Sequence, residues 1–306
     1  MKPSLFAAVA VLVGIVLAPL KAVEPLSSRI AHTDSAKYKP SPSVHGGAGR
    51  LDFMALLDFH ALDTNLSFLH RGVIEPRSGI GHHFHNNCEE MFVILDGEAQ
   101  FTVDGRTSSL KGPAGVPTRM GHSHAIYNAT DKPVQWMNIN VSILKGDYDN
   151  FDLNDKRDDV ALDKTPVFMT MSLDRSLLRS INAFHGGKRA VQYRRALGPS
   201  VFSTAWAFVD HVVLPPGASI GPHSYRGLAQ FYYVMTGEGT VSVSARGQQD
   251  TSAIRTGDAV PIQIGEVHSL ENTATQPLEL MVVGVARDLR KELDFVDVNP
   301  AASQKH

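Results

Sequence analysis

The chain of 306 residues contains a single cysteine, Cys88, and no long run of charges of one sign. One cysteine excludes an intramolecular disulfide, so the fold must depend on its hydrophobic core. The formal net charge of −2 gives no strongly basic surface, and neither nucleic acid nor an anionic membrane is expected as a partner. Hydrophobic residues make up 43% of the chain and charged residues 20%, which is typical of a globular protein with a large core.

Long apolar runs are also missing, with one exception at the amino terminus. A lysine at the second position precedes an almost wholly apolar stretch, Leu5–Leu20, and Ala22 offers a small residue for cleavage. This pattern predicts a signal peptide over residues 1–22, and therefore export to the periplasm or the exterior. The alternative is an uncleaved membrane anchor, which the short run and Pro19 disfavour. Residues 23–50 have no periodicity and are expected to form a flexible lead-in, with no membrane contact after cleavage.

The chain contains an internal repeat. The segment Leu69–His85 has a counterpart 140 positions later in Val209–Tyr225, and a second block matches at an offset of 144. The matched pairs are Pro76 and Pro216, Gly81 and Gly221, His83 and His223, Gly97 and Gly237, Pro117 and Pro261, Gly121 and Gly265, His124 and His268, and Asn128 and Asn272. This repeat predicts two domains of one fold. The expected boundaries are a first domain over residues 51–145, a linker over 146–197, a second domain over 198–292 and a tail over 293–306.

Both copies consist of short runs rich in Val, Ile and Phe, which Gly, Pro and Asp-Gly interrupt. Such spacing is typical of strands in a closed barrel or jelly roll, so we expect an all-β fold with one barrel in each domain. The linker differs, because Ser172–Phe184 has apolar residues at helical spacing and Asp174 near its start. We therefore expect one short helix in the linker.

The stretch HHFHNNCEE places metal-binding side chains directly before an apolar strand. Side chains two apart share a face of a strand, so His83 and His85 point the same way. Glu90 begins the next strand on the inward face, whereas Glu89 would point outward. His124 lies on a later strand. If the strands close into a barrel, three imidazoles and one carboxylate converge, and this donor set suits a divalent transition metal ion.

These spacings resemble the two motifs of the cupin superfamily. The first motif, G…HxHx(3–4)Ex(6)G, is met by His83, His85, Glu90 and Gly97. The second, PxGx(2)Hx(3)N, is met by Pro117, Gly121, His124 and Asn128, with two additional residues between Pro and Gly. The repeat makes the chain resemble a bicupin, which implies two tandem double-stranded β-helix, or jelly-roll, barrels. One divalent metal ion is expected as cofactor, and iron, manganese, copper, nickel and zinc all fit its ligands.

In the second copy, the four equivalent positions hold His223, Tyr225, Gln230 and His268. Tyrosine has a pKa near 10 and is rarely an anionic ligand, and glutamine brings a neutral oxygen in place of a charge. We therefore expect the second domain to be structural or to bind a small polar molecule. A weak metal site at these residues is the alternative.

Three further features lie near the first motif. His122 precedes His124 by two positions, and two interpretations remain open: an acid–base residue that acts with Glu90, or a rim histidine paired with a carboxylate. Cys88 is expected to be buried and inert. The acidic stretch Asp147–Asp159 lacks the glycine and ligand order of an EF-hand, so it is expected to form a solvated face of the linker.

The side chains expected to surround the metal are apolar, which favours a small chelating organic substrate. They are Phe92, Ile94 and Ile126. Met137 and Ile139 lie on the apolar face of a later strand, and the sequence leaves open which face of that strand looks into the cavity. The cupin resemblance itself does not choose a reaction, because the superfamily contains dioxygenases, decarboxylases, isomerases, lyases and binding proteins. A dioxygenase-type oxidoreductase is the first hypothesis, since a metal with open coordination positions can hold oxygen beside a substrate.

Two other hypotheses are kept. One is a metal-dependent isomerase, lyase or decarboxylase acting on a sugar acid or keto acid, which oxygen uptake would distinguish from a dioxygenase. The other is a non-catalytic protein that binds a small molecule such as a carbohydrate. Metal analysis of the wild type and of His83→Ala tests whether a metal enzyme is present at all. The chain is expected to be a monomer or a homodimer.

Overall fold

The computed structural model describes residues 24–245, 247–291 and 295–298, and nearly all regular structure in them is β. The predicted signal peptide, residues 1–22, lies outside the described residues. Within the described part of the chain, no helix has the length and apolarity needed to span a bilayer. The short helices are α1 (Leu26–Arg29) and the 3₁₀ turns η1 (Ser35–Lys37), η2 (Val44–Gly46), η3 (Arg175–Leu177), η4 (Phe184–Gly186) and η5 (Pro199–Val201).

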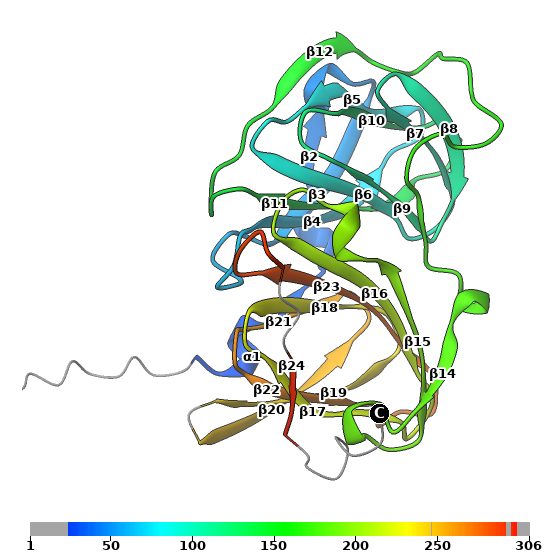
Figure 1. Cartoon of the computed structure of the whole chain (residues 1–306). Coiled ribbons are helices and arrows are strands. Elements are labelled where there is room, and N and C mark those ends of the chain that lie inside the picture. The colour runs from blue at the N-terminus through cyan, green and yellow to red at the C-terminus, as the bar shows by residue number, and fades with distance from the viewer. Residues whose placement is uncertain (1–23, 246, 292–294, 299–306) are drawn as a thin grey trace, which may run out of the picture.

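The first of two stacked barrels (Figure 1) consists of a seven-stranded sheet and a five-stranded sheet. The seven-stranded sheet has the order β13 (Met171–Ser172), β9 (Ala114–Thr118), β6 (Cys88–Ile94), β11 (Val134–Ser142), β4 (Leu66–Ile74), β3 (Arg50–Leu57) and β2 (Lys39–Pro42). The five-stranded sheet has the order β12 (Phe151–Asp155), β5 (Ser78–Phe84), β10 (Ser123–Asn128), β7 (Glu98–Val103) and β8 (Arg106–Lys111).

The second barrel repeats this plan. Its seven-stranded sheet has the order β1 (Ala31–His32), β21 (Asp258–Ile262), β18 (Leu228–Thr236), β23 (Leu278–Ala286), β16 (Trp206–Leu214), β15 (Ala190–Leu197) and β14 (Arg179–Asn182). Its five-stranded sheet has the order β20 (Gln248–Arg255), β19 (Glu238–Ala245), β22 (Val267–Glu271), β17 (Ser219–Tyr225) and β24 (Phe295–Asp297). All described strand pairs are antiparallel. The predicted all-β fold with two jelly-roll barrels is thus confirmed.

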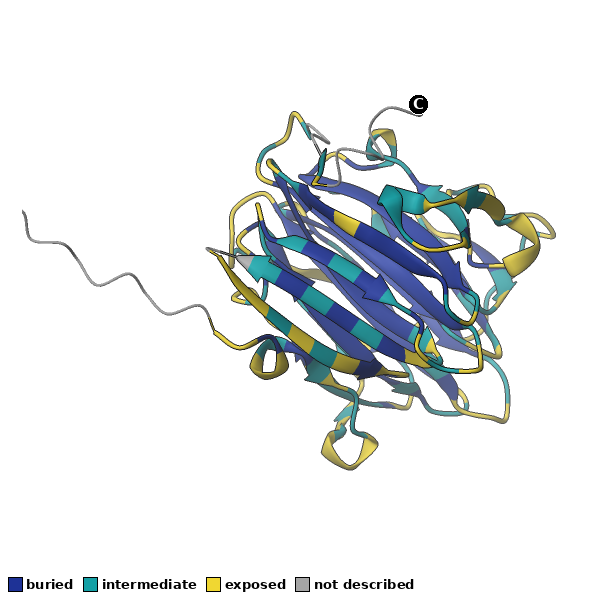
Figure 2. Ribbon diagram, turned by 90° about the horizontal axis from the view of Figure 1, so that it is seen from below, coloured by how far each residue is buried: buried dark blue, intermediate teal, exposed yellow. Residues whose placement is uncertain are grey.

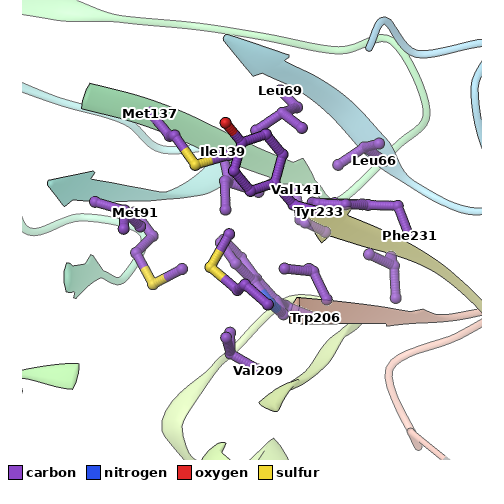
Figure 3. Close-up of a cluster of buried hydrophobic side chains, with 14 of the residues drawn as sticks. Leu66, Leu69, Met91, Met137, Ile139, Val141, Trp206, Val209, Phe231 and Tyr233 are labelled. Atoms are coloured by element: carbon purple, nitrogen blue, oxygen red, sulfur yellow. The ribbon is translucent and has the colours of Figure 1, made fainter. Parts of the chain in front are cut away.

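The two seven-stranded sheets face each other and bury a common apolar core (Figure 3). Met91 and Val93 of β6 and Met137 and Ile139 of β11 pack there against the second barrel. The alternate residues of the same strands, including Phe92, point into the first barrel. Because both faces of these sheets are covered at their centres, the central strands β6, β11, β16 and β23 are buried almost throughout. Burial alternates along outer strands such as β20 (Figure 2).

The segment before the first barrel is ordered, which corrects the expected flexible lead-in over residues 23–50. Leu26 and Ile30 pack into the core of the second barrel, and β1 pairs with β21 of that barrel. The reciprocal strand β13 pairs with β9 of the first barrel. The segment that precedes each barrel is called its arm; β1 lies in the arm of the first barrel and β13 in the arm of the second. The two arms are exchanged, so that each barrel receives an edge strand from the arm of the other barrel.

The expected linker over residues 146–197 also differs from the prediction, since it contributes strands to both barrels. The helix predicted over Ser172–Phe184 is wrong: the segment contains only the single turn η3, then β14 and the start of η4. Leu177, which a continuous helix would need to bury, is 44% exposed, so no packed apolar face supports a helix here. Backbone pairing of β14 with β15 replaces the helical hydrogen bonds.

Candidate metal centre

The first barrel brings together the four residues that the sequence singles out as ligands. His83, His85, Glu90 and His124 are all at most 2% exposed, and their ligand atoms lie within 4.8 Å of one another. The Nε2 atoms of the three histidines lie 3.8, 3.5 and 3.4 Å from Glu90 Oε2, in chain order. One ion at the centre of this group could contact all four side chains.

Three strands position these groups by their alternation. In the five-stranded sheet, His83 of β5 is in register with His124 of β10, so the two rings start side by side. Glu90 comes from the opposite sheet, where it is in register with Asn140 of β11. His85 follows the end of β5 and remains on the face of His83. The barrel closes these two sheets on one interior point.

The orientation of the imidazoles fits a metal ion. His83 Nδ1 donates a hydrogen bond to Gly81 O at 2.7 Å, and His85 Nδ1 donates to Asp149 O at 2.5 Å. Both rings therefore direct their other nitrogen, Nε2, inward. His83 Nε2 is buried and has no hydrogen-bond partner among the described residues. An orphaned imidazole nitrogen beside a buried carboxylate is the arrangement that a divalent cation would satisfy.

The charges of this cluster favour a metal as well. Burial raises the pKa of Glu90, but the nearby imidazoles of His83 and His85 outweigh this effect and hold the pKa well below its usual value. Burial, assisted by His83, lowers the pKa of His124, so this ring is neutral. Burial also lowers the pKa of His85, but Cys88 and Glu90 outweigh burial and raise this pKa to about 11. Without metal, the cluster therefore retains a proton on His85 that a cation would displace.

Two neighbours that the sequence reasoning missed hold the ligands in place. Asn140 Nδ2 donates to Glu90 Oε1 at 3.2 Å. The ring of His45 stacks on His83 with centroids 3.9 Å apart, and His45 Nδ1 lies 2.6 Å from Asp152 Oδ1. A signal for His45 exists in the sequence, because the tripeptide His-Gly-Gly at residues 45–47 recurs 140 positions later at residues 185–187.

The interior wall beside the cluster is partly polar. Asn138 of β11 is in register with His70 of β4, and the Oδ1 atom of Asn138 is buried without a hydrogen-bond partner among the described residues. Burial lowers the pKa of His70 to about 4, so its imidazole is neutral. The face of β11 that the sequence left open is now assigned: Met137 and Ile139 do not line this space, because both belong to the core between the barrels. The wall can therefore offer neutral hydrogen-bonding groups to a bound molecule.

His122 does not join the cluster, so its predicted catalytic role is not supported. It lies before the start of β10, where strand alternation no longer determines its direction. Its ring is about half exposed, and Nδ1 lies 2.6 Å from Asp104 Oδ2. The alternative interpretation, a rim histidine paired with a carboxylate, describes this position.

The acidic stretch is not the expected solvated face alone, because part of it covers the metal cluster. Asp149 contacts His85 through its backbone oxygen and accepts hydrogen bonds from the backbone N–H groups of Asn86 and Asn87. Asp152 lies on β12, which pairs with β5. Glu89 points away from the cluster, as predicted, but it is buried against the second barrel.

The equivalent position of the second barrel is occupied by internal hydrogen bonds. His223 and His268 lie together, with ring centroids 4.1 Å apart. Gln230 Nε2 and the Tyr232 hydroxyl lie 2.7 and 2.9 Å from His268 Nε2, and His268 Nδ1 lies 3.2 Å from Glu266 O. The metal-binding nitrogen of this imidazole is thus already satisfied. The geometry favours a structural or small-molecule role over a metal site.

Comparisons with known proteins agree with this architecture. The cupin domain family matches residues 70–140 and 210–284. The oxalate-binding protein of Thermotoga maritima is 31% identical over 103 residues, which cover 34% of this chain and 82% of that protein.

Solved structures of oxalate decarboxylases are similar in fold. The Bacillus subtilis enzyme at pH 4.6 has a TM-score of 0.62 at 15% identity, over 88% of this chain and 78% of that one. The formate complex of the Lactobacillus farciminis enzyme has a TM-score of 0.64 at 14% identity, over 90% of each chain. The B. subtilis enzyme has Mn(II) centres. With two matched domains, two jelly-roll barrels and the paired histidine motifs, the chain belongs to the cupin superfamily and has a bicupin architecture.

Proposed function

We propose that this protein is a metal-dependent decarboxylase-type lyase that acts on a small dicarboxylic acid, with oxalate as the first candidate. The observation that carries the proposal is the buried cluster of three imidazole nitrogens and one ionised carboxylate in the first barrel. The oxalate-binding and oxalate decarboxylase functions of its relatives supply the substrate class. Dioxygenase chemistry, the first expectation from sequence, has no specific support among these relatives.

In this proposal, His83, His85, Glu90 and His124 hold the ion. A bound divalent metal would supply a Lewis acid to which a carboxylate can chelate. Since the three imidazoles are neutral as ligands, the ion and Glu90 together carry a net charge of +1, which complements an anionic substrate. Asn138, whose amide oxygen has no hydrogen-bond partner in the described part of the chain, is placed to bind a hydroxyl, a water molecule or a protonated carboxyl group.

The chain can also orient the substrate and limit the access of water. His70 is neutral and partly exposed, and it can hydrogen-bond without competing for the metal as a charge. The residues around Asp149 cover His85 on the side where β12 joins the sheet. Loss of carbon dioxide breaks the carbon–carbon bond beside a carboxylate and leaves an electron pair that must be protonated. A partly dry, polar wall is suited to that proton transfer.

A second candidate is binding of the same acid without turnover. It is favoured by the position of His122, because the acid–base residue expected from sequence lies at the rim and pairs with Asp104. The similarity to an oxalate-binding protein supports it as well. Both candidates share the metal site and differ only in the fate of the ligand.

The two candidates are separated by measuring products and binding on one metal-loaded preparation. Metal content is determined for the wild type, for His83→Ala and for the rim control His122→Ala. Oxalate is then added, with and without oxygen, and carbon dioxide, formate, oxygen uptake and heat of binding are followed. Formate release supports the lyase, whereas stoichiometric binding without products supports the binding protein. Oxygen consumption coupled to turnover would favour the dioxygenase, and metal-free wild-type protein would refute all three.

We also propose export of the protein, from the residue pattern of positions 1–22. The test is the amino-terminal sequence of the protein recovered from the periplasm or medium of the expressing cell. Cleavage after Ala22 supports export, and an intact amino terminus on cytosolic protein contradicts it.

A further inference from the structure

The second barrel contains a cavity of about 310 Å³. This volume lies near the lower end of the range for small-molecule sites, so it suits a ligand of roughly one ring. Six elements contribute to its wall, namely β14, η4, β15, β16, β17 and β24. The lining residues are Ile181, Asn182, Ala183, Phe184, His185, Tyr193, Arg195, Asp210, Tyr225 and Asp297.

The cavity occupies the place that corresponds to the ligand-facing space of the first barrel. At the repeat offset of 140, Tyr225 stands where the first barrel has His85, and Asp210 stands where it has His70. The cavity therefore extends to the position of a lost metal ligand. His268 does not line the cavity, and its Nε2 is already hydrogen-bonded to Gln230 and Tyr232, so a ligand here would be held without metal.

The charged groups of the cavity wall are paired with one another. Arg195 forms two hydrogen bonds to Asp210, from Nε to Oδ1 at 2.9 Å and from Nη2 to Oδ2 at 3.1 Å. Tyr193 donates its hydroxyl to Asp210 Oδ2 at 3.1 Å, and His185 Nδ1 lies 2.7 Å from Asp297 Oδ1. Arg195 is the one arginine or lysine among the lining residues named above, and its charge is balanced by Asp210, so the wall has no uncompensated guanidinium or ammonium group with which to attract an anion.

The same wall combines fixed polar groups with aromatic rings. Asp210 is 6% exposed, and its two oxygens are held in place by Arg195 and Tyr193. The rings of Phe184 and Tyr193 lie 5.2 Å apart and tilted, and Tyr225 closes another side. Flat apolar surfaces beside rigid donors and acceptors suit a molecule whose faces are apolar and whose edge carries hydroxyl groups.

We propose that this cavity is a metal-independent binding site for a neutral, hydroxyl-bearing molecule about the size of one sugar ring. The proposal goes beyond the proposed metal chemistry and does not depend on it, since it concerns the other barrel. It assigns Asp210 and Tyr193 as polar contacts and Phe184 as an aromatic face. It also accounts for the replacement of metal ligands by Tyr225 and Gln230 within an otherwise preserved barrel.

The experiment compares two probes that differ in one group, D-glucose and D-glucuronate, with myo-inositol as a second neutral probe. Binding to the full-length, metal-loaded protein is measured by calorimetry and by ligand-observed NMR. We expect saturable binding of a neutral probe, and at least tenfold weaker binding of the carboxylate analogue. Asp210→Asn should weaken neutral binding at least tenfold, and Tyr193→Phe should weaken it several-fold. The control His85→Ala should lose metal and bind the neutral probe normally.

Circular dichroism and metal content establish that each second-barrel variant is folded. Several outcomes overturn the proposal. These are no saturable binding of D-glucose or myo-inositol, binding that folded Asp210→Asn and Tyr193→Phe leave unchanged, or tighter binding of D-glucuronate. A second equivalent of metal that disappears in His268→Ala would also overturn it. None of these results bears on metal binding by the first barrel, so the two proposals fail separately.

Discussion

Glu89 and Glu90 are adjacent in sequence but point to opposite sides of the sheet, so their removal should affect different properties. Glu90→Gln copies the residue that the second barrel has at this position, and we expect the barrel to remain folded. Loss of a residue that merely supports a ligand costs about 10–100-fold in metal affinity. Loss of the charged ligand itself should cost at least ~100-fold, which is roughly 2.8 kcal/mol.

Glu89→Ala should leave metal affinity unchanged and weaken the contact between the barrels. The Glu89 carboxylate is 1% exposed and accepts hydrogen bonds from Ser203 N at 2.7 Å, Thr204 N at 2.8 Å and Thr204 Oγ1 at 2.6 Å. Each buried donor left without a partner costs about 1–3 kcal/mol, and some donors will find water. We therefore expect the free energy of unfolding to fall by roughly 3–5 kcal/mol, as for other broken buried charge networks.

The assay combines urea unfolding, followed by fluorescence and circular dichroism, with competitive metal titration of both variants. The expected pattern is a large drop in the urea midpoint with normal metal affinity for Glu89→Ala, and the reverse for Glu90→Gln. If Glu89→Ala instead lost metal at unchanged stability, the assignment of strand faces would be refuted. Equal effects of both variants on both measurements would contradict it as well.

Three further perturbations test other parts of the structure. Burial raises the pKa of Glu279, but hydrogen bonds with His211 and Arg175 lower it to about 2. The ionised Glu279 therefore contributes about 1–2 kcal/mol to the free energy of unfolding after solvent screening, and this contribution is present above pH 4.5 and lost towards pH 2. Glu279→Gln should flatten the acid branch of the stability curve, and an unchanged curve would contradict the pairing. Asn140→Gly, which introduces the second-barrel residue, should lower metal affinity about 10–100-fold, and equal affinity in a competition titration would exclude a supporting role. Gly47→Ala would place Cβ 2.2 Å from Gly79 O. It should lower the free energy of unfolding by more than ~3 kcal/mol and also lower metal content, whereas the matched change Gly187→Ala should lower stability alone. Normal metal content in Gly47→Ala would argue that η2, which carries His45, does not support the metal ligands.

The barrel plan and the ligand cluster could be predicted because both follow from a period of two along strands. Alternation places Glu90 with Phe92 inside the barrel and Glu89 outside, and it aligns His83 with His85. The repeat then supplies the second barrel without further assumptions. Such local rules are independent of the partners that each strand later finds.

The features that escaped prediction depend on long-range pairing or on segments outside regular strands. The helical spacing of Ser172–Phe184 is real, but β14 gains hydrogen bonds from β15 that sequence alone does not reveal. His122 lies one residue before its strand, where alternation stops. His45 reaches the metal cluster from the arm, and the turn that places it has a positive φ of 49°. Only the tertiary fold connects these residues to the site.

The reciprocal placement of β1 and β13 has a consequence for how this chain can be divided. A cut between β12 and β13 would separate each barrel from the edge strand that completes its inner sheet. It would also uncover the apolar face between the barrels, so neither fragment should be stable as an isolated monomer. Two copies of one fragment, however, could each lend an arm to the other. This geometry is the one expected if an ancestral one-barrel homodimer with swapped arms was fused into a single polypeptide.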